Sequence, residues 1–442
     1  MEAVIANYAA TVKIMDDDLV QANANFKGRM EFMNSNEKRR MKNVIKTTLT
    51  MMKTPMNCEE ICYDMTVKTW WEQFKESNYP DNQCLEFMRC SRKTYIYLID
   101  VLSPHIVPRN QVAIGQRTPI KRVPADKQIA IVLSKLTNRD DLVTLSSKFT
   151  ISKATVQKTI HKVVVKICEH LLPLVIKMPD AAEAAEIAES FEKETKFPQI
   201  IGLLDTLHVP VYNASGMANA FVNSKLYYSF IAQMIIDSKN CFRDVSIRHP
   251  GATTDVKVLA DSNIFRLHKK VIPPETQNVN GLKIPYCVIA PCSYPLLPWI
   301  LTEYTEPSTH SELLFNAQID TARQLGKTAI RRMRARFDII NHPIDISIKV
   351  LPQLIGCCFA LHNICERHGD FMSEDMLKTA TCAANNFDQP EKVPFDNRNI
   401  GQVASRQRDC IKNYFSSLNL LEESTFGYMD YQNIDMLTEE VV

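Results

Sequence analysis

The stretch from Gln199 to Tyr212 reads QIIGLLDTLHVPVY. Its first half is an apolar run that ends in a carboxylate, Asp205, and such a run predicts a buried strand with an acid at its end. The segment from His208 to Tyr212 can continue the strand after a turn. From here to about residue 260 the pattern of the chain changes from helical to strand-like, so we expect the sheet of the protein to begin with this stretch.

Further strands follow at short spacing. The segments Tyr227 to Asp237 and Cys241 to Ile247 predict two strands joined by a hairpin turn at residues 238–240. The turn after them ends in a second carboxylate, Asp255, and Lys283 to Ile289 predicts a fourth strand. Carboxylates that converge from the ends of such elements often hold Mg²⁺. Two acids can also be ordinary strand-end or helix-capping residues, and the spacing alone leaves both interpretations open.

The region before the sheet has a helical pattern. Residues 67–107 show helical apolar spacing, which Pro104 and Pro108 are expected to interrupt. From Arg109 to His170 there are 12 Lys and Arg against four acids. A short helix over Leu142 to Phe149, a turn, and a long helix capped by Ser152 form a helix-turn-helix pattern. The expected exposed residues of the long helix are Lys153, Gln157, Lys158, His161 and Lys162. The same pattern also occurs in helical bundles that bind no DNA.

The chain after the sheet is charged in blocks. Residues 311–337 predict a long helix, whose part from Arg323 to Phe337 has six Lys and Arg and no acid. An apolar helix from Leu351 to Glu366 must be buried. The tail is acidic, and its last segment, Glu423 to Val442, contains no Lys or Arg. This acidic tail is either solvated or a segment that binds a basic partner. The basic arm at residues 1–64 is either solvated or a contact for nuclear import or for nucleic acid.

Composition excludes several classes of protein. The chain has 442 residues, a net charge of +2 and only 11 glycines, and it contains neither of the common glycine-rich nucleotide loops. Its 13 cysteines are scattered without paired metal-binding spacing, which is typical of reduced thiols in a cytosolic or nuclear protein. No apolar run reaches the roughly 18–20 residues of a membrane helix. The N-terminus lacks the pattern of a secretory signal.

Several ordered motifs carry a resemblance to a known family. Gly202 to Pro210 is similar to the G-x-x-D-G-T-H-x-P of PIF/Harbinger transposases and the nucleases derived from them, and Phe242 to Val258 is similar to their F-x-D-V-x-x-x-x-P-G-x-x-x-D-x-x-V. Three further segments match strings of the same family: Asn223 to Gln233, Tyr294 to Tyr304 and Cys357 to Cys365. The resemblance covers about residues 65–415. It implies an RNase H-like α/β domain behind a helical N-terminal region.

The resemblance also implies a chemistry and shows where this chain departs from it. Members of the DDE superfamily use two Asp and one Glu to hold two divalent metals that cleave a phosphodiester. Asp205 and Asp255 match the first two acids, but Lys327 stands at the position of the Glu, and Pro291 replaces a further family acid. A lysine directed at this site would oppose Mg²⁺ and could form a salt bridge to either aspartate instead.

Together, the sequence patterns and the resemblance predict an α/β protein with an RNase H-like DDE core, preceded by an all-helical region with a helix-turn-helix. The expected segments are an arm (1–64), a helical region (65–178, with the helix-turn-helix at about 126–172), the DDE domain (195–368) and a helical, acidic tail (369–442). The expected contacts with DNA are Lys153, Gln157, Lys158, Lys162, Arg331, Arg332, Arg334 and Arg336. The arginines can also be a solvated or intrachain-paired face.

The expected function is that of a domesticated Harbinger-type transposase that has lost strand cleavage. We expect it to bind DNA or chromatin, or to recruit proteins. The expected location is the nucleus, with the cytoplasm as a further location. The resemblance implies a Myb/SANT-like protein partner, and no membrane or resident cofactor is expected. The first alternative is an active nuclease dependent on Mg²⁺ or Mn²⁺, with Glu312 or Asp320 replacing the missing acid. The second alternative is an adaptor that binds only proteins.

Overall fold

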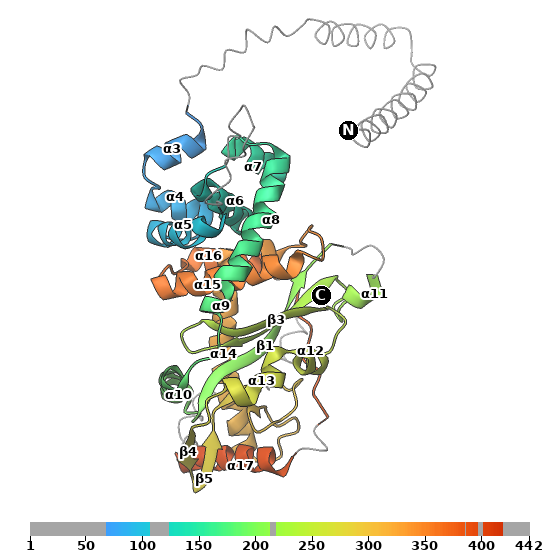
Figure 1. The fold of residues 1–442 in the computed structure, drawn as a ribbon. Helices are drawn as coiled ribbons and strands as arrows, with labels where there is room; N and C mark the ends of the chain where they lie inside the picture. Colours follow the sequence, from blue (N-terminus) through green and yellow to red (C-terminus); the bar gives the residue numbers. More distant parts are fainter. Residues whose placement is uncertain (1–67, 107–122, 213–217, 385, 397–400, 419–442) are drawn as a thin grey trace, which may run out of the picture. The chain divides into compact units, whose positions relative to one another are not determined.

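The computed structural model describes residues 68–106, 123–212, 218–384, 386–396 and 401–418 (Figure 1). Thr69–Val442 forms one compact unit by itself. The arm expected at residues 1–64 and the segment Glu423 to Val442 lie outside the described residues. Among the residues that are described, no helix is both long and apolar enough to cross a membrane.

The first part of the unit is helical over the residues that are described. The bounds of the helices are α3 Trp70–Glu76, α4 Asp81–Met88, α5 Arg92–Ile106, α6 Ala125–Asn138, α7 Leu142–Phe149, α8 Lys153–His170, α9 Leu172–Val175 and α10 Ala181–Thr195. The predicted break at Pro104 is wrong, because α5 continues through this residue. Pro104 removes one backbone hydrogen-bond donor from α5, and this loss does not end the helix. Pro108 lies outside the described residues.

The predicted pair of helices around Ser152 is confirmed as α7 and α8. Thr150 ends α7 in the left-handed conformation, with a φ of 52°. The hydroxyl of Ser152 then accepts a hydrogen bond from the backbone N–H of Thr155, which caps α8. The apolar face of α8 is buried. Its other face is left for solvent over the first two turns, where Lys153, Gln157 and Lys158 are exposed.

A mixed five-stranded sheet follows, which confirms the predicted α/β class. The strands are β1 Ile200–Pro210, β2 Ser229–Ile236, β3 Phe242–Pro250, β6 Cys287–Ile289 and β7 Ile300–Leu301, in the order β3-β2-β1-β6-β7. β2 pairs antiparallel with β1 and β3, whereas β6 pairs parallel with β1 and β7. β1 and β2 are buried along almost their whole length, as their continuous apolar runs require.

Two strand predictions need correction. β1 does not turn after Asp205 but runs on to Pro210, since the cross-strand pairs with β2 continue to Ser229. Asp205 therefore lies inside a strand rather than at its end. The predicted fourth strand is divided at Tyr286 into β5 Leu282–Pro285 and β6. β5 belongs to a separate hairpin with β4 Thr276–Val279.

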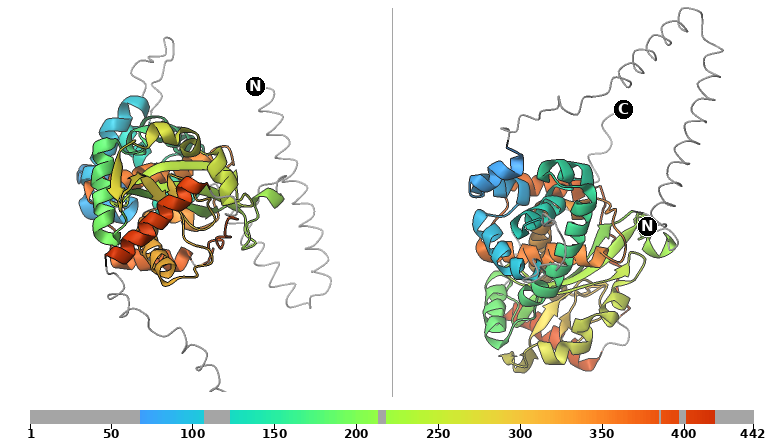
Figure 2. Two further views of the ribbon diagram at one scale, coloured as in Figure 1. Left: turned by 90° about the horizontal axis from the view of Figure 1, so that it is seen from below. Right: turned by 45° about the horizontal axis from the view of Figure 1, so that its top comes forward.

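Helices cover both faces of the sheet. In the left view of Figure 2, α13 Asn263–Val271 lies on one side and the long helix α14 His310–Arg336 lies on the other, together with α17 Gln402–Ser417. Gly326 lets α14 approach β1 closely, because a Cβ at this position would lie 3.2 Å from a methyl of Leu203. The remaining elements are α11 Ala218–Phe221, α12 Asp255–Asp261, η1 Asp338–Asn341, α15 Leu351–His368 and α16 Glu374–Ala384.

The described part of the predicted tail is integrated into the fold. Both α16 and α17 pack on α14. Phe415 of α17 is fully buried, and its ring lies 4.7 Å from the ring of Phe197. The described residues between 369 and 418 are therefore largely structural rather than a solvated extension of the chain.

Candidate functional site: two carboxylates around one lysine

The fold brings the two predicted acids together. Asp205 projects from the interior of β1, and Asp255 is the first residue of α12. Thr206, the neighbour of Asp205, donates a side-chain hydrogen bond to one carboxylate oxygen of Asp255 at 3.0 Å. Ser293 donates to the other oxygen at 2.6 Å. Gly251 permits the tight turn before α12, because a Cβ there would lie 2.6 Å from the backbone oxygen of Phe221.

A lysine lies between the two carboxylates, and it is Lys392. Its ammonium is 3.0 Å from Asp205 Oδ1 and 3.2 Å from Asp255 Oδ2, and it also donates to the hydroxyl of Thr206. Burial alone would raise the pKa of Asp255, but the ammonium and the hydrogen bonds outweigh burial and lower it. Burial would lower the pKa of Lys392, and the two carboxylates raise it instead. The site is thus a closed ion triad.

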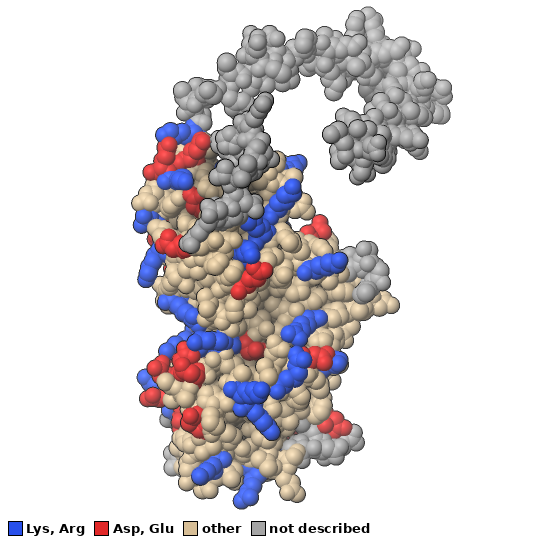
Figure 3. Space-filling model, in the orientation of Figure 1, with Lys and Arg blue, Asp and Glu red and all other residues tan. Residues whose placement is uncertain are grey.

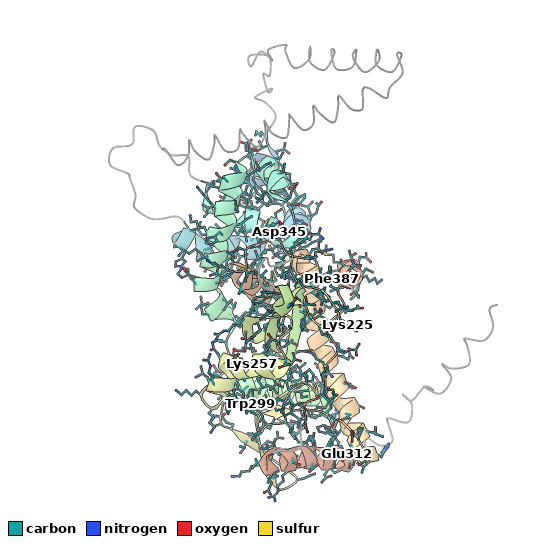
Figure 4. All side chains as sticks on the ribbon, turned by 90° about the vertical axis from the view of Figure 1, so that its right-hand side faces the viewer. Lys225, Lys257, Trp299, Glu312, Asp345 and Phe387 are labelled. Carbon is teal, nitrogen blue, oxygen red and sulfur yellow. The ribbon has the colours of Figure 1, made fainter. Side chains whose placement is uncertain are left out.

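The segment that carries Lys392, residues 386–396, is here named the strap. Gln389 fixes it to β1, because its amide oxygen accepts from the backbone N–H of His208 at 2.8 Å and its amide nitrogen donates to the carbonyl of the same residue at 3.2 Å. Phe395 donates its backbone N–H to the carbonyl of Cys292. Phe387 packs edge-on against Tyr227, and Figure 4 shows it near Lys225, which pairs with Glu391 at 2.7 Å.

Lys327 has a different place from the one expected. It is exposed on α14 and lines a pocket together with Asp205 and Lys392. Within the described part of the chain it makes no ion pair, so the salt bridge hypothesised for Lys327 is made by Lys392. Pro291, at the position of the other family acid, is buried. Sequence reasoning missed Lys392 because nothing in its local sequence distinguishes it.

The residues present do not fit the metals that the resemblance implies. Catalytic Mg²⁺ needs several oxygen ligands, and here an ammonium occupies the space between Asp205 and Asp255. Over the described ranges, no group of three or more His, Cys, Asp or Glu side chains is placed to hold a metal. We therefore derive no metal-dependent step for this site.

Glu312 and Asp320, the acids considered as replacements for the missing Glu, make other contacts. Glu312 is in the first turn of α14, where it caps the helix with Thr309 and lies 3.6 Å from Lys412. Figure 4 shows it at the end of α14 opposite to Lys225 and Phe387. Asp320 is exposed and pairs with Arg323 at 3.6 Å. Because α14 is one continuous helix, Glu312 cannot approach the position of Lys327.

The arginines expected to contact DNA on α14 are mostly internal. Arg336 has no exposed side-chain surface, and it lies 3.5 Å from Glu366 and donates to the backbone oxygens of Arg89 and Asp370. Arg332 binds the same carboxylate at 2.8 Å. Arg334 is buried. The prediction of Arg336 as a DNA contact is therefore wrong, because burial keeps its guanidinium from any phosphate. Of the four arginines that were predicted on α14, Arg331 is the exposed one.

The basic face of α8 is open at its N-terminal end. Lys153, Gln157 and Lys158 are exposed, whereas Lys162 is half-buried and donates to Gln128 at 3.4 Å. Gln157 and Lys158 also line a groove bordered by residues 345–350. Figure 3 shows Lys and Arg side chains over α8 and again lower on the same face, over α12 and α13.

Asp244 lies in β3, and the structure predicts a pH effect from it. Burial raises the pKa of Asp244 to about 6, opposed in part by Arg248. Because the folded pKa is above the unfolded one, the contribution of this carboxyl to stability falls as pH rises from about 4 to 6. We expect Asp244→Asn to raise the free energy of unfolding by about 1–3 kcal/mol at pH 8 and to change little at pH 4. Urea unfolding at both pH values tests this, and an equal difference at both would contradict it.

The chain is similar to a known protein family and to several known proteins. Residues 204–363 match the model of the DDE superfamily endonuclease family. The chain is 25% identical over 326 residues to the Arabidopsis thaliana protein named Antagonist of Like Heterochromatin Protein 1, covering 70% of this chain and 80% of the relative. It is 20% identical over 319 residues to HARBI1 of Homo sapiens, whose name contains the word nuclease, covering 72% of this chain and 86% of that protein. No solved structure matches the chain.

Proposed function

The chain belongs to the Harbinger transposase-derived DDE family, and on this premise we propose that it is a nuclear DNA-binding protein that no longer cleaves DNA. The observation that carries the proposal is the ammonium of Lys392 between Asp205 and Asp255. An ammonium at this place provides the positive charge that a metal would otherwise provide, without a water or hydroxyl that could attack a phosphodiester. The site keeps its shape and has no nucleophile to activate.

The proposed fold assignment is an RNase H-like core with a DNA-binding helix-turn-helix in front of it. The mixed sheet, with Asp205 on its central strand and Asp255 hydrogen-bonded to the neighbouring Thr206, supports the first part. The exposed first turns of α8 support the second, since the N-terminal residues of a recognition helix are the ones that reach a groove of DNA. Lys153, Gln157 and Lys158 are the proposed contacts there.

The proposed setting is chromatin. The name of one relative, Antagonist of Like Heterochromatin Protein 1, supports this choice over free DNA. The family resemblance supports a Myb/SANT-like protein as the partner that selects the DNA sequence. The contacts proposed on α8 are then mainly with phosphates, which position the protein without reading the sequence.

We expect salt-sensitive binding to duplex DNA that is weakened by Lys153→Ala/Lys158→Ala. Loss of two phosphate contacts is expected to reduce affinity at least fivefold and to reduce the slope of log affinity against log salt by about 2. Fluorescence anisotropy with a labelled duplex at several salt concentrations measures both. Lys269→Ala/Lys270→Ala on α13 is the matched control, since it removes the same charge from another exposed helix.

The same samples decide between the proposed function and its alternatives. Incubation with Mg²⁺ or Mn²⁺ followed by a denaturing gel is expected to show intact DNA. Metal-dependent cleavage that is lost in Asp205→Ala would establish the nuclease instead. Absence of duplex binding at low salt would favour an adaptor that binds only proteins.

A further inference from the structure

A pocket of about 400 Å³ lies between α14, β1 and the strap, and its charged lining is almost entirely cationic. The charged residues that line it are Arg323, Lys327, Arg331, Arg334 and Lys392, against the single acid Asp205. Asp205 is already paired with Lys392 at 3.0 Å. The four cations from α14 therefore face a pocket whose one carboxylate is neutralised.

Arg334 is a cation of this lining that has no counterion among the described residues, whereas Arg323 pairs with Glu303 and Asp320. Its side chain is only 9% exposed, and its Nε donates to the side-chain oxygen of Asn341 at 3.0 Å. Its Nη2 atom is buried and has no hydrogen-bond partner. Arg332 and Arg336, on either side, both contact Glu366. No carboxylate in the described residues takes that role for Arg334, and a guanidinium stays charged in a protein, so its charge favours an anion in the pocket that it lines.

The spacing along α14 directs the cations to one place. Arg323, Lys327, Arg331 and Arg334 follow one another at intervals of four, four and three residues, which places them on one face of the helix. A planar guanidinium and an ammonium side by side suit the oxygens of a phosphate. Leu207, Ile330 and Ala380 complete the lining with apolar surface, which limits water around a bound anion.

We propose that this pocket binds the phosphate group of an anionic ligand, with Lys327, Arg331 and Arg334 as its contacts. The proposal goes beyond DNA binding through α8, because the pocket uses a different helix and a different set of cations. The phosphate can belong to a small phosphorylated molecule or to a nucleic-acid backbone, and the chemistry of recognition is the same for both.

The test is calorimetric titration of the full chain with pyrophosphate in metal-free buffer at constant ionic strength. We expect saturable binding at one site and at least tenfold weaker binding by Lys327→Ala/Arg331→Ala. Both residues are exposed at the rim, so their loss does not disturb the core. The control is Lys269→Ala/Lys270→Ala on α13, which removes the same charge from an exposed helix and is expected to bind pyrophosphate as the unaltered protein does.

Two results would overturn the proposal: no saturable binding by the unaltered protein, or equal weakening by the α14 and α13 variants. A further arm identifies the source of the phosphate. If saturating pyrophosphate displaces labelled duplex DNA, and this requires Lys327 and Arg331, the pocket holds a backbone phosphate. If duplex and pyrophosphate bind together, it holds a small phosphorylated molecule. Failure of duplex binding alone would concern only the function proposed for α8.

Discussion

Lys392→Met is expected to lower the free energy of unfolding at pH 7 by about 2–3 kcal/mol. Removing one partner of a buried ion pair costs about 3–5 kcal/mol, and the estimate is reduced because the side chain of Lys392 retains 22% exposure. The loss arises because Asp205 and Asp255 then face each other without a cation between them. Urea unfolding followed by circular dichroism measures it.

A matched control is available at a second ion pair between the strap and the rest of the fold. Lys225→Met removes the ion pair to Glu391, which is largely exposed, and is expected to change stability little. Adding Asp255→Asn to Lys392→Met is expected to recover part of the loss, because one of the two unpaired charges disappears. An unchanged unfolding midpoint in Lys392→Met would show that the triad does not hold the strap.

The same variant should change the response to metal. With the ammonium removed, we expect Mn²⁺ to bind weakly at the two carboxylates, as measured by electron paramagnetic resonance, whereas the unaltered protein does not bind it there. Mn²⁺ binding by the unaltered protein that is abolished by Asp205→Ala would contradict the role given to Lys392.

Arg336→Met is expected to destabilise the protein by about 3–5 kcal/mol. Arg336 is fully buried and connects the end of α14 with Glu366 of α15 and with the backbone at Arg89 and Asp370. Its loss leaves buried carbonyl groups without a donor and Glu366 with Arg332 as its remaining partner. Guanidinium chloride unfolding measures the effect.

Arg331→Met, five residues earlier on the same helix, is the control for this experiment. It removes an identical charge from an exposed position and is expected to leave stability unchanged. Equal destabilisation by the two substitutions would mean that the general charge of α14, rather than the buried contacts of Arg336, stabilises the helix.

The sequence predicted the α/β class, the positions of α7, α8, α14 and α15, and the two acids at the site. These features follow from apolar periodicity, capping residues and local motifs, which short stretches of chain contain. The prediction that Asp205 and Asp255 lie close together came from the family resemblance and from the expectation that acids converge at the ends of elements. In the structure Asp205 lies within β1.

What the sequence did not predict depends on distant contacts. Lys392 reaches Asp255 across 137 residues, and no pattern around it marks this contact. The burial of Arg336 was hidden by the many basic residues beside it, which resemble a solvated face. One residue in the sequence does indicate a buried basic partner. Glu366 is a lone acid near the end of the apolar helix α15, and a buried acid there requires a basic partner.

The position of the strap late in the chain sets the order in which the site is completed during synthesis. Asp205, Asp255 and most of the sheet leave the ribosome first, and Lys392 follows 137 residues after Asp255. At about 5–20 residues per second, this interval lasts roughly 7–27 s. During that time the nascent chain carries both carboxylates without Lys392, so the ion triad can form only after the strap has been synthesised.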